Sequence, residues 1–241
     1  MHQKSFVELF DQVRIINMTS RTDRRQETVA EFKRGSLPIE TGTIRFFPAI
    51  TPDTAEGFSS RGARGCYMSH LEVLREAQQQ QARHVLILED DIAFVRNINT
   101  LGSHAFLALQ ELAWDVAYFG HVLPSSKKNP HWQKVDQAVF SAHCYAINGS
   151  AINKLVELLE TMLTRQPGDP LGGPMHYDGA LNWFFRHNDQ VNAYYYTHCL
   201  GYQRPSATNI HALGKFDRLP GVAGLMTLAR YLKREYLRVI N

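Results

Sequence analysis

Three consecutive acidic residues, Glu89, Asp90 and Asp91, directly follow an apolar run at residues 85–88. The run is typical of a buried strand in an α/β sheet, so the acids lie at the carboxyl end of that strand. Adjacent carboxylates repel each other and are costly to bury without a partner. Oxygen-rich clusters bind Mg²⁺ or Mn²⁺, usually together with substrate phosphates, and α/β sheets bind ligands outside the carboxyl ends of their strands. The cluster therefore predicts a cation site, and the alternative is a solvated acidic turn.

An arginine-rich turn follows the first predicted strand, residues 13–17, and opens a helix that extends to about residue 33. Its arginines are Arg21, Arg24 and Arg25. Helix N-terminal amides and guanidinium groups together bind phosphate well. Three cations in a first turn also oppose the helix dipole, which favours an anionic ligand there. The alternative is a helix capped at Ser20 or Thr22 whose basic first turn is solvated.

Among the remaining acids, Asp178 is the best candidate for a general base. It follows a flexible connection at residues 168–174 and precedes the amphipathic segment 180–187. A carboxylate on such a loop can reach a hydroxyl proton of a substrate. The alternative is that Asp178 caps the helix. Asp115, at the start of a predicted strand, is the reserve candidate, and it too has a capping alternative.

The remaining pattern predicts an α/β domain. Strands are expected at residues 13–17, 44–50, 84–89, 92–95, 114–120 and 139–147, and helices at residues 22–33, 66–81, 101–112, 150–163 and 180–187. Residues 121–134 are expected to form a loop, either a substrate lid or a plain excursion. Ser69 and His70 lie in the first turns of the second helix, where a histidine is more often packed or capping than a ligand.

Composition narrows the class of protein. The chain has 241 residues, 44% hydrophobic and 20% charged, with a net charge of +3, which is typical of one globular domain. This weak positive charge suits a small anionic substrate or a membrane surface and is too small to indicate nucleic acid. Its 3 cysteines lie far apart in the sequence, so their spacing indicates neither a disulfide framework nor a zinc site. With no signal-peptide pattern and no apolar run of membrane-spanning length, we expect a cytoplasmic protein.

Residues 219–241 are expected to form an amphipathic basic helix after a main domain at residues 1–218. Apolar residues such as Leu225, Leu228 and Leu232 follow helical spacing, and basic residues occupy the remaining face. Such a helix either packs on the domain or lies at the surface of an anionic membrane.

The order of the motifs resembles glycosyltransferase family 25, which includes bacterial lipooligosaccharide galactosyltransferases and collagen galactosyltransferases. The motifs are Ile16-Asn17 with Arg21, Asp23, Arg24 and Arg25; Phe47-Pro48-Ala49-Ile50; Gly65-Cys66-Tyr67-Met68-Ser69-His70-Leu71; and Leu86-Ile87-Leu88-Glu89-Asp90-Asp91. The resemblance is dense over residues 13–96 and looser beyond them.

The resemblance implies a GT-A-type fold, in which a Rossmann-like mixed sheet with flanking helices binds a nucleotide sugar and an acidic motif holds Mn²⁺ or Mg²⁺. The usual motif is Asp-x-Asp, and by analogy Glu89 faces the ribose and Asp91 the metal. Donor contacts are expected from Asn17, Arg21, Arg24, Arg25, Ser69, Glu89 and Asp90.

The implied reaction is inverting transfer of galactose or a similar hexose from a UDP-sugar to a saccharide or lipid-linked saccharide, as in lipopolysaccharide biosynthesis. Two alternatives remain. One is a nucleotide-sugar-binding protein without turnover, which the altered first acid of the motif allows. The other is a nucleotidyltransferase, which would normally carry a glycine-rich phosphate loop that is absent near the first strand.

Overall fold

A computed structural model of the protein describes residues 4–204. The expected helix at residues 219–241 and its membrane contact lie outside the described residues. Between residues 4 and 204, no helix combines the length and the apolar character that crossing a membrane requires.

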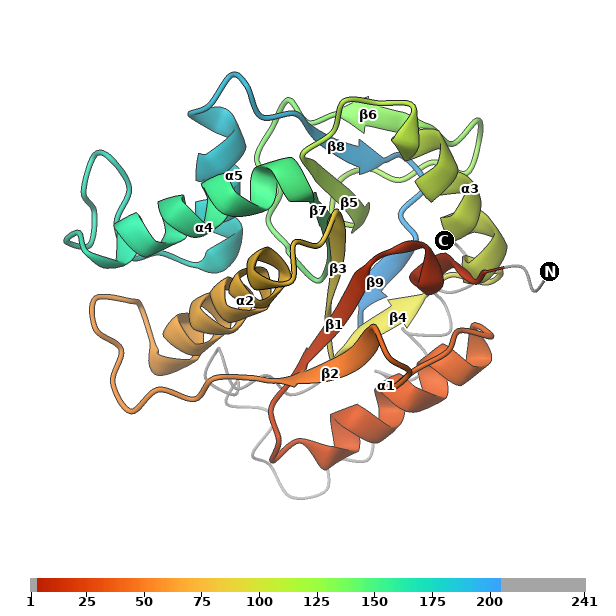
Figure 1. Ribbon diagram of the computed structural model, residues 1–241, viewed down its shortest axis with the longest axis horizontal. Helices are drawn as coiled ribbons and strands as arrows, with labels where there is room; N and C mark the ends of the chain where they lie inside the picture. Colours follow the sequence, from red (N-terminus) through yellow and green to blue (C-terminus); the bar gives the residue numbers. More distant parts are fainter. Residues whose placement is uncertain (1–3, 205–241) are drawn as a thin grey trace, which may run out of the picture.

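The described residues form a mixed sheet flanked by helices (Figure 1), which confirms the predicted fold class. The helices are η1 (Phe6–Leu9), α1 (Thr22–Arg34), α2 (Arg61–Gln79), α3 (Ile98–Gln110), α4 (Gly149–Leu163) and α5 (Tyr177–Arg186). The strands are β1 (Gln12–Asn17), β2 (Ile44–Pro48), β3 (His84–Glu89), β4 (Ile92–Phe94), β5 (Val116–Gly120), β6 (Trp132–Lys134), β7 (Cys144–Asn148), β8 (Ala193–Tyr196) and β9 (Gly201–Gln203).

The main path of the sheet has the order β2-β1-β3-β7-β5-β8-β6, and β9 connects β4 to β5. Strand β1 pairs in parallel with β2 and β3, whereas β7 runs antiparallel between β3 and β5. Strand β5 therefore points the same way as β3. The carboxyl ends of β1, β3 and β5 consequently lie at one edge of the sheet.

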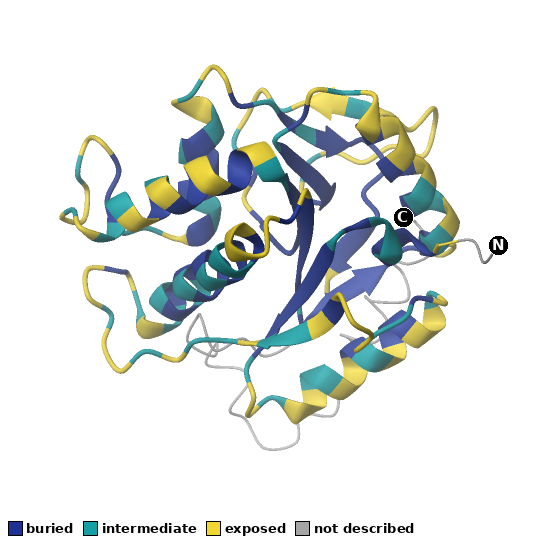
Figure 2. Ribbon diagram, viewed as in Figure 1, coloured by how far each residue is buried: buried dark blue, intermediate teal, exposed yellow. Residues whose placement is uncertain are grey.

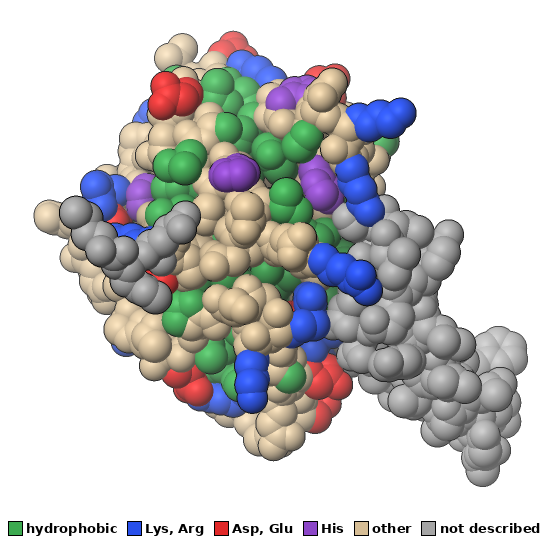
Figure 3. All heavy atoms as spheres, turned by 90° about the vertical axis from the view of Figure 1, so that its right-hand side faces the viewer, with side chains coloured by type: hydrophobic (Ala, Val, Ile, Leu, Met, Phe, Trp, Pro, Cys, Tyr) green, Lys and Arg blue, Asp and Glu red, His purple; other side chains and the backbone are tan. Residues whose placement is uncertain are grey.

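Helices cover both faces of this sheet (Figure 1), with α2, α4 and α5 on one face and α1, α3 and η1 on the other. Along β3, Val85 and Ile87 pack into the first hydrophobic cluster, and Leu86 and Leu88 pack into the second. A strand buried on both faces needs a continuous apolar run, which is what residues 85–88 provide. Figure 2 shows the buried strands between helices whose outer faces are exposed. On the face seen in Figure 3, lysine and arginine side chains are interspersed with acidic and hydrophobic ones.

Helices α2, α3 and α5 begin three to five residues earlier than the sequence predicted. Helix α2 begins at Arg61, five residues early, where the Ser60 hydroxyl accepts a hydrogen bond from the Ala63 amide at 3.0 Å. Helix α4 begins at Gly149, directly after β7, with Asn148 in the cap position.

The strand pattern also differs from the prediction. The segment 139–143 is not strand: the backbone amide and carbonyl of Val139 bond to the Asn182 side chain of α5, both at 2.8 Å, and not to a neighbouring strand. Strand β6 forms inside the expected loop 121–134, pairing antiparallel with the unpredicted β8, and the unpredicted β9 completes the sheet beside β4.

Helix α2 is fixed to the sheet by a buried ion pair. The Arg14 side chain of β1 is 1% exposed, and its Nε and Nη2 donate to both carboxylate oxygens of Glu76 at 3.0 and 2.9 Å. Its Nη1 donates to the Thr43 carbonyl at 2.7 Å, so Arg14 also contacts the segment before β2. This interaction joins the C-terminal part of α2 to the first half of β1 and to the segment before β2.

Because Glu76→Ala would leave the Arg14 guanidinium charged and buried, we expect it to lower the free energy of unfolding by about 3–5 kcal/mol. The matched control is Glu72→Ala, one turn earlier on α2, whose ion pair with Arg75 is partly exposed and should contribute less than about 1 kcal/mol. Urea denaturation measures both values. Equal losses in the two variants would show that the Arg14 ion pair does not fix α2.

Candidate functional site

A cavity of about 380 Å³ lies where β1, β2 and β3 end, against the N-terminal half of α2 and the start of α1. It is lined by Ile16, Met18, Arg21, Arg24, Ala49, Ile50, Thr51, Pro52, Arg61, Gly62, Gly65, Cys66, Ser69, His70, Glu89 and Asp90. Its size is within the range of small-molecule sites, and open α/β sheets bind their ligands at this edge.

The cavity has two chemically different parts. Apolar side chains from the ends of β1 and β2, including Ile16 and Ile50, form one wall. Arginines and carboxylates, including Arg21, Arg24 and Asp90, form the other. A ligand with a flat or apolar body and an anionic group fits both parts at once.

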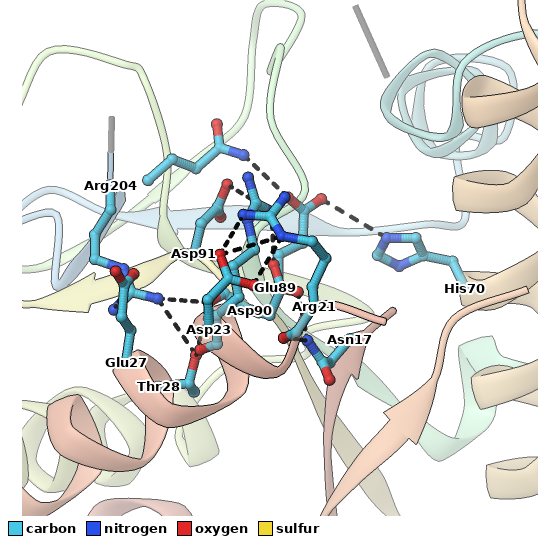
Figure 4. Close-up of polar contacts among 12 residues, drawn as sticks. Asn17, Arg21, Asp23, Glu27, Thr28, His70, Glu89, Asp90, Asp91 and Arg204 are labelled. Atoms are coloured by element: carbon cyan, nitrogen blue, oxygen red, sulfur yellow. Dashed lines mark hydrogen bonds and ion pairs between the residues drawn. The ribbon is translucent and has the colours of Figure 1, made fainter. Parts of the chain in front are cut away.

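Asp90 connects the segments around this cavity (Figure 4). One carboxylate oxygen accepts a hydrogen bond from the side-chain amide of Asn17, and the other accepts one from Arg24 Nη1, both at 2.7 Å. The Asp90 carbonyl also accepts hydrogen bonds at 2.6 Å from the hydroxyl of Thr28 and from Arg204. Because this carboxylate is only 5% exposed and already bonded, Asp90 positions the arginine and the strand ends around it.

Asp91 has a different environment although it is the next residue. It is 9% exposed, and within residues 4–204 its Oδ1 is buried and accepts no hydrogen bond. Its Oδ2 lies 3.7 Å from Arg24 Nη1. Burial, together with repulsion from Glu89, raises the pKa of Asp91 to about 7. A buried, unsatisfied carboxylate oxygen of this kind fits a divalent cation, which would supply the missing positive partner.

The Glu89 side chain extends toward His70 of α2 (Figure 4). Its Oε1 lies 3.9 Å from His70 Nε2, and its Oε2 accepts a hydrogen bond from Gln203 at 3.0 Å. Burial would raise the pKa of this carboxyl, but His70 and the more distant His143 outweigh it, so that the pKa is lowered. The three acids of the motif therefore face three different sets of partners.

The three arginines predicted to bind phosphate are not equivalent. Arg21 and Arg24 line the cavity, and Arg21 also pairs with Asp23 at 2.8 Å. Arg25 does not line the cavity: its side chain pairs with Glu40 and lies 4.2 Å from the centre of the Phe46 ring. Successive residues of a helix point about 100° apart, so Arg24 and Arg25 cannot share a face.

Ser69 lines the cavity but is fully buried, and its hydroxyl is already used within the protein. It donates to the Gly65 carbonyl at 2.6 Å and accepts from the Ile50 amide at 2.8 Å. Gly65 allows this close approach, since a Cβ there would lie 2.5 Å from the Ile50 carbonyl oxygen. Ser69 thus fixes the wall that α2 and the segment after β2 form together.

Asp178 lies in the first turn of α5, and His176 holds the cap position, so the capping alternative for Asp178 is wrong. The adjacent Tyr177 ring stacks on His70 with centroids 4.0 Å apart, which places the start of α5 against the cavity wall. Burial and then the charges of Glu89 and Asp178 raise the pKa of the Cys66 thiol, so Asp178 is within electrostatic range of the cavity. Its side chain does not itself line that cavity.

The reserve base, Asp115, is at the wrong edge of the sheet. It precedes β5, whose direction matches that of β3, and so lies opposite the cavity. Its carboxylate accepts hydrogen bonds from the Asn192 amide at 2.8 Å and from the Ser150 hydroxyl at 3.4 Å. Asp115 therefore holds α4 and the segment before β8.

Several contributors were missed in the sequence. Arg204 reaches Asp90 from the far end of the described chain, and its backbone amide donates to the Asp91 carbonyl at 2.7 Å. Only the pairing of β9 with β4 brings it there, and no local motif reports such a contact. Arg61 was missed because α2 was expected to begin later.

Similar proteins are known. The chain is 21% identical to the human "Inactive glycosyltransferase 25 family member 3", with 72% of this chain and 38% of that protein covered. It is 27% identical to "Procollagen galactosyltransferase 1-B" of Xenopus laevis, with 50% and 24% covered. The chain thus spans less than half the length of either relative. The apo glycosyltransferase GlyE of Streptococcus pneumoniae TIGR4 aligns with a TM-score of 0.38 and 14% identity, with 80% of this chain and 45% of that chain covered.

The family assignment rests on the match to a family model. The model of "Glycosyltransferase family 25 (LPS biosynthesis protein)" matches residues 10–170, which include the strand ends, the arginine-rich turn and the acidic motif described above. The chain belongs to glycosyltransferase family 25.

Proposed function

We propose that this protein transfers a sugar from a UDP-sugar to the hydroxyl of a saccharide acceptor, with inversion at the anomeric carbon. The two-part cavity carries the proposal. Its apolar wall suits a nucleobase, and Arg21 and Arg24 at the start of α1 suit a diphosphate. Galactose or a similar hexose is the proposed donor sugar. The proposed acceptor is a saccharide or lipid-linked saccharide of lipopolysaccharide biosynthesis, which the description of the family supports.

Asp91 is the proposed holder of Mn²⁺ or Mg²⁺, because its buried Oδ1 needs a positive partner. A bound cation would supply positive charge to the departing diphosphate. Arg24 adds fixed positive charge on the same side, and Asp90 and Asn17 hold it in place before the donor arrives.

Asp178 is the proposed general base. Inversion requires that the acceptor hydroxyl attack from the side opposite the diphosphate, and α5 begins on the α2 side of the cavity, against His70. A carboxylate there can remove the hydroxyl proton once the acceptor lies between α5 and the donor.

A nucleotide-sugar-binding protein without turnover is the second candidate. It is favoured by the position of Asp178 outside the cavity lining, and one similar human protein is named inactive. A nucleotidyltransferase is less well supported, since Met18-Thr19-Ser20-Arg21 after β1 contains no glycine.

A donor screen separates these functions. The full chain is incubated with Mn²⁺ and individual UDP-sugars, and free UDP is measured with and without saccharide acceptors. Release of UDP that depends on the acceptor supports the transferase. Tight binding of UDP without release supports the binding protein, and formation of a UDP-sugar from UTP and a sugar phosphate supports the nucleotidyltransferase.

The pKa of Asp91 gives a prediction for the metal-free protein. A carboxyl whose pKa is about 7 when folded and near 3.8 when unfolded makes folding less favourable as the pH rises through that interval. In EDTA, the Asp91→Asn variant should therefore become more stable relative to the wild type as the pH rises from 4 to 8. We expect the difference between their free energies of unfolding to grow by at most about 4 kcal/mol. Chemical denaturation at several pH values measures this difference, and a difference independent of pH would contradict it. Asp90→Asn, which removes a bonded carboxylate, is the control and should lower stability at pH 8.

The arginine assignment is tested with UDP and uridine. We expect Arg24→Ala to weaken UDP about 10–100-fold and uridine little, because only UDP carries the diphosphate that a charged hydrogen bond would hold. Arg25→Ala is the matched control, since its side chain lies outside the cavity, and it should change neither affinity more than about twofold. Isothermal titration measures all four values. Equal weakening of UDP and uridine by Arg24→Ala would argue against the assignment.

For the general base, we expect Asp178→Asn to leave UDP affinity intact and to lower transfer about 10²–10⁴-fold. Loss of negative charge near the start of α5 should cost only about 0.3–1 kcal/mol of stability. The control is Asp189→Asn, an exposed acid just beyond the same helix, which should leave transfer unchanged. Normal turnover in the Asp178 variant would exclude it as the base.

A further inference from the structure

Cys66, His70 and Glu89 form a cluster that the proposed transfer reaction does not use in full. Cys66 and His70 lie one helical turn apart on α2, so they share a face, and that face meets Glu89 at the end of β3. A ligating atom from each of the three lies within 4.8 Å of those of the other two. All three residues line the cavity, so an ion could reach them from solvent.

The orientation of His70 is set by its neighbours. Its Nδ1 is hydrogen-bonded to the Tyr145 hydroxyl at 2.8 Å, and that hydroxyl is bonded at 2.8 Å to the hydroxyl of Tyr177. Its ring is also stacked on the Tyr177 ring, at an interplanar angle of 9°. A metal-binding histidine is usually held in this way through its second nitrogen. The imidazole is therefore fixed with Nε2 directed toward Glu89.

On that side, His70 Nε2 faces the Glu89 carboxylate. Its distance to Glu89 Oε1, 3.9 Å, is too long for a hydrogen bond. The His70 side chain is 1% exposed, so a buried nitrogen, a carboxylate and a thiol converge without direct bonding between them. This arrangement leaves room for a cation between the three.

We propose that Cys66 Sγ, His70 Nε2 and the Glu89 carboxylate bind a thiolate-preferring divalent cation of the Zn²⁺ type, with a fourth position open to the cavity. Sulfur, imidazole nitrogen and one carboxylate are a zinc donor set, and three protein ligands with one open position are common for zinc. On binding, the Cys66 thiol loses its proton to solvent, and the thiolate becomes the ligand.

The geometry needs little adjustment. Zinc bonds of 2.0–2.3 Å in a tetrahedron separate the ligand atoms by about 3.5 Å. The three atoms lie within 4.8 Å of one another, so rotations of the Cys66 and Glu89 side chains close the difference. His70, which its two tyrosine contacts hold in place, does not need to move.

This site is distinct from the one proposed at Asp91. Asp91 offers a hard oxygen ligand, which suits Mn²⁺ or Mg²⁺. It is not one of the three ligands described here. The cysteine spacing in the sequence indicated no zinc site, since the three ligands come from one helix face and a strand end. The inference does not depend on the proposed sugar transfer.

The test uses Co²⁺ as a spectroscopic substitute for Zn²⁺ in the full, metal-free chain. We expect one Co²⁺ per chain to give a thiolate-to-cobalt charge-transfer band in the near ultraviolet and the visible bands of four-coordinate cobalt, and Zn²⁺ to displace it. Cys66→Ser should abolish the charge-transfer band, and Glu89→Gln should weaken Co²⁺ binding at least about tenfold. Cys199→Ser is the matched control, because Cys199 is also a free cysteine but lies outside the cluster.

Asp91→Asn separates the two sites. It should keep the charge-transfer band, whether or not it changes the binding of UDP and Mn²⁺. A second measurement needs no variant: Zn²⁺ should protect Cys66 of the wild-type chain from alkylation, as read by peptide mass spectrometry. Absence of the charge-transfer band in the wild type, its persistence in Cys66→Ser, or alkylation of Cys66 unaffected by Zn²⁺ would each overturn the proposal.

Discussion

The Asp90 carboxylate and the arginine that it binds hold the site together. Asp90 follows β3, Asn17 ends β1, and Arg24 lies in the first turns of α1, so two short hydrogen bonds fix three segments in one place. A buried carboxylate is tolerated only when its partners compensate for lost hydration, and here an amide and a guanidinium do so. The Asp90 carbonyl adds Thr28 and Arg204 to the same network. These bonds hold Arg24 and the ends of β1 and β3 beside the cavity.

Asp90 also explains how neighbouring acids acquire different tasks. Because successive side chains leave a strand end in different directions, Glu89 turns to α2, Asp90 to α1, and Asp91 toward a buried position that lacks a full set of partners. One acid has its charge balanced by an arginine and one is stabilised by a histidine. The third remains costly to ionise, with its pKa raised to about 7. It is this difference in environment, and not the acidity of the motif as such, that identifies Asp91 as the candidate ligand for a cation.

Parts of the fold and site were predictable because their signals are local. The apolar run 85–88 identifies a strand buried on both faces, and the acids that follow must then lie at its carboxyl end. The arginine-rich turn correctly placed Arg21 and Arg24 beside the cavity. Arg25 lies outside the cavity because the helix rotates it onto another face, where Glu40 and Phe46 contact it. The direction of β5 places Asp115 at the edge of the sheet opposite the cavity. That direction follows from β7 running antiparallel between β3 and β5, which no local sequence pattern reveals. The contacts of Arg204 and the meeting of Cys66, His70 and Glu89 likewise exist only after the sheet and α2 are assembled.

The central claim is that a cation at Asp91 and the arginine held by Asp90 bind a nucleoside diphosphate in the cavity. The most direct measurement is calorimetric titration of UDP into wild type and Asp91→Asn, each with Mn²⁺ and with EDTA, after confirming that both proteins are folded. We predict that Mn²⁺ strengthens UDP binding to the wild type and has no effect on the variant. An equal gain from Mn²⁺ in both proteins would contradict it.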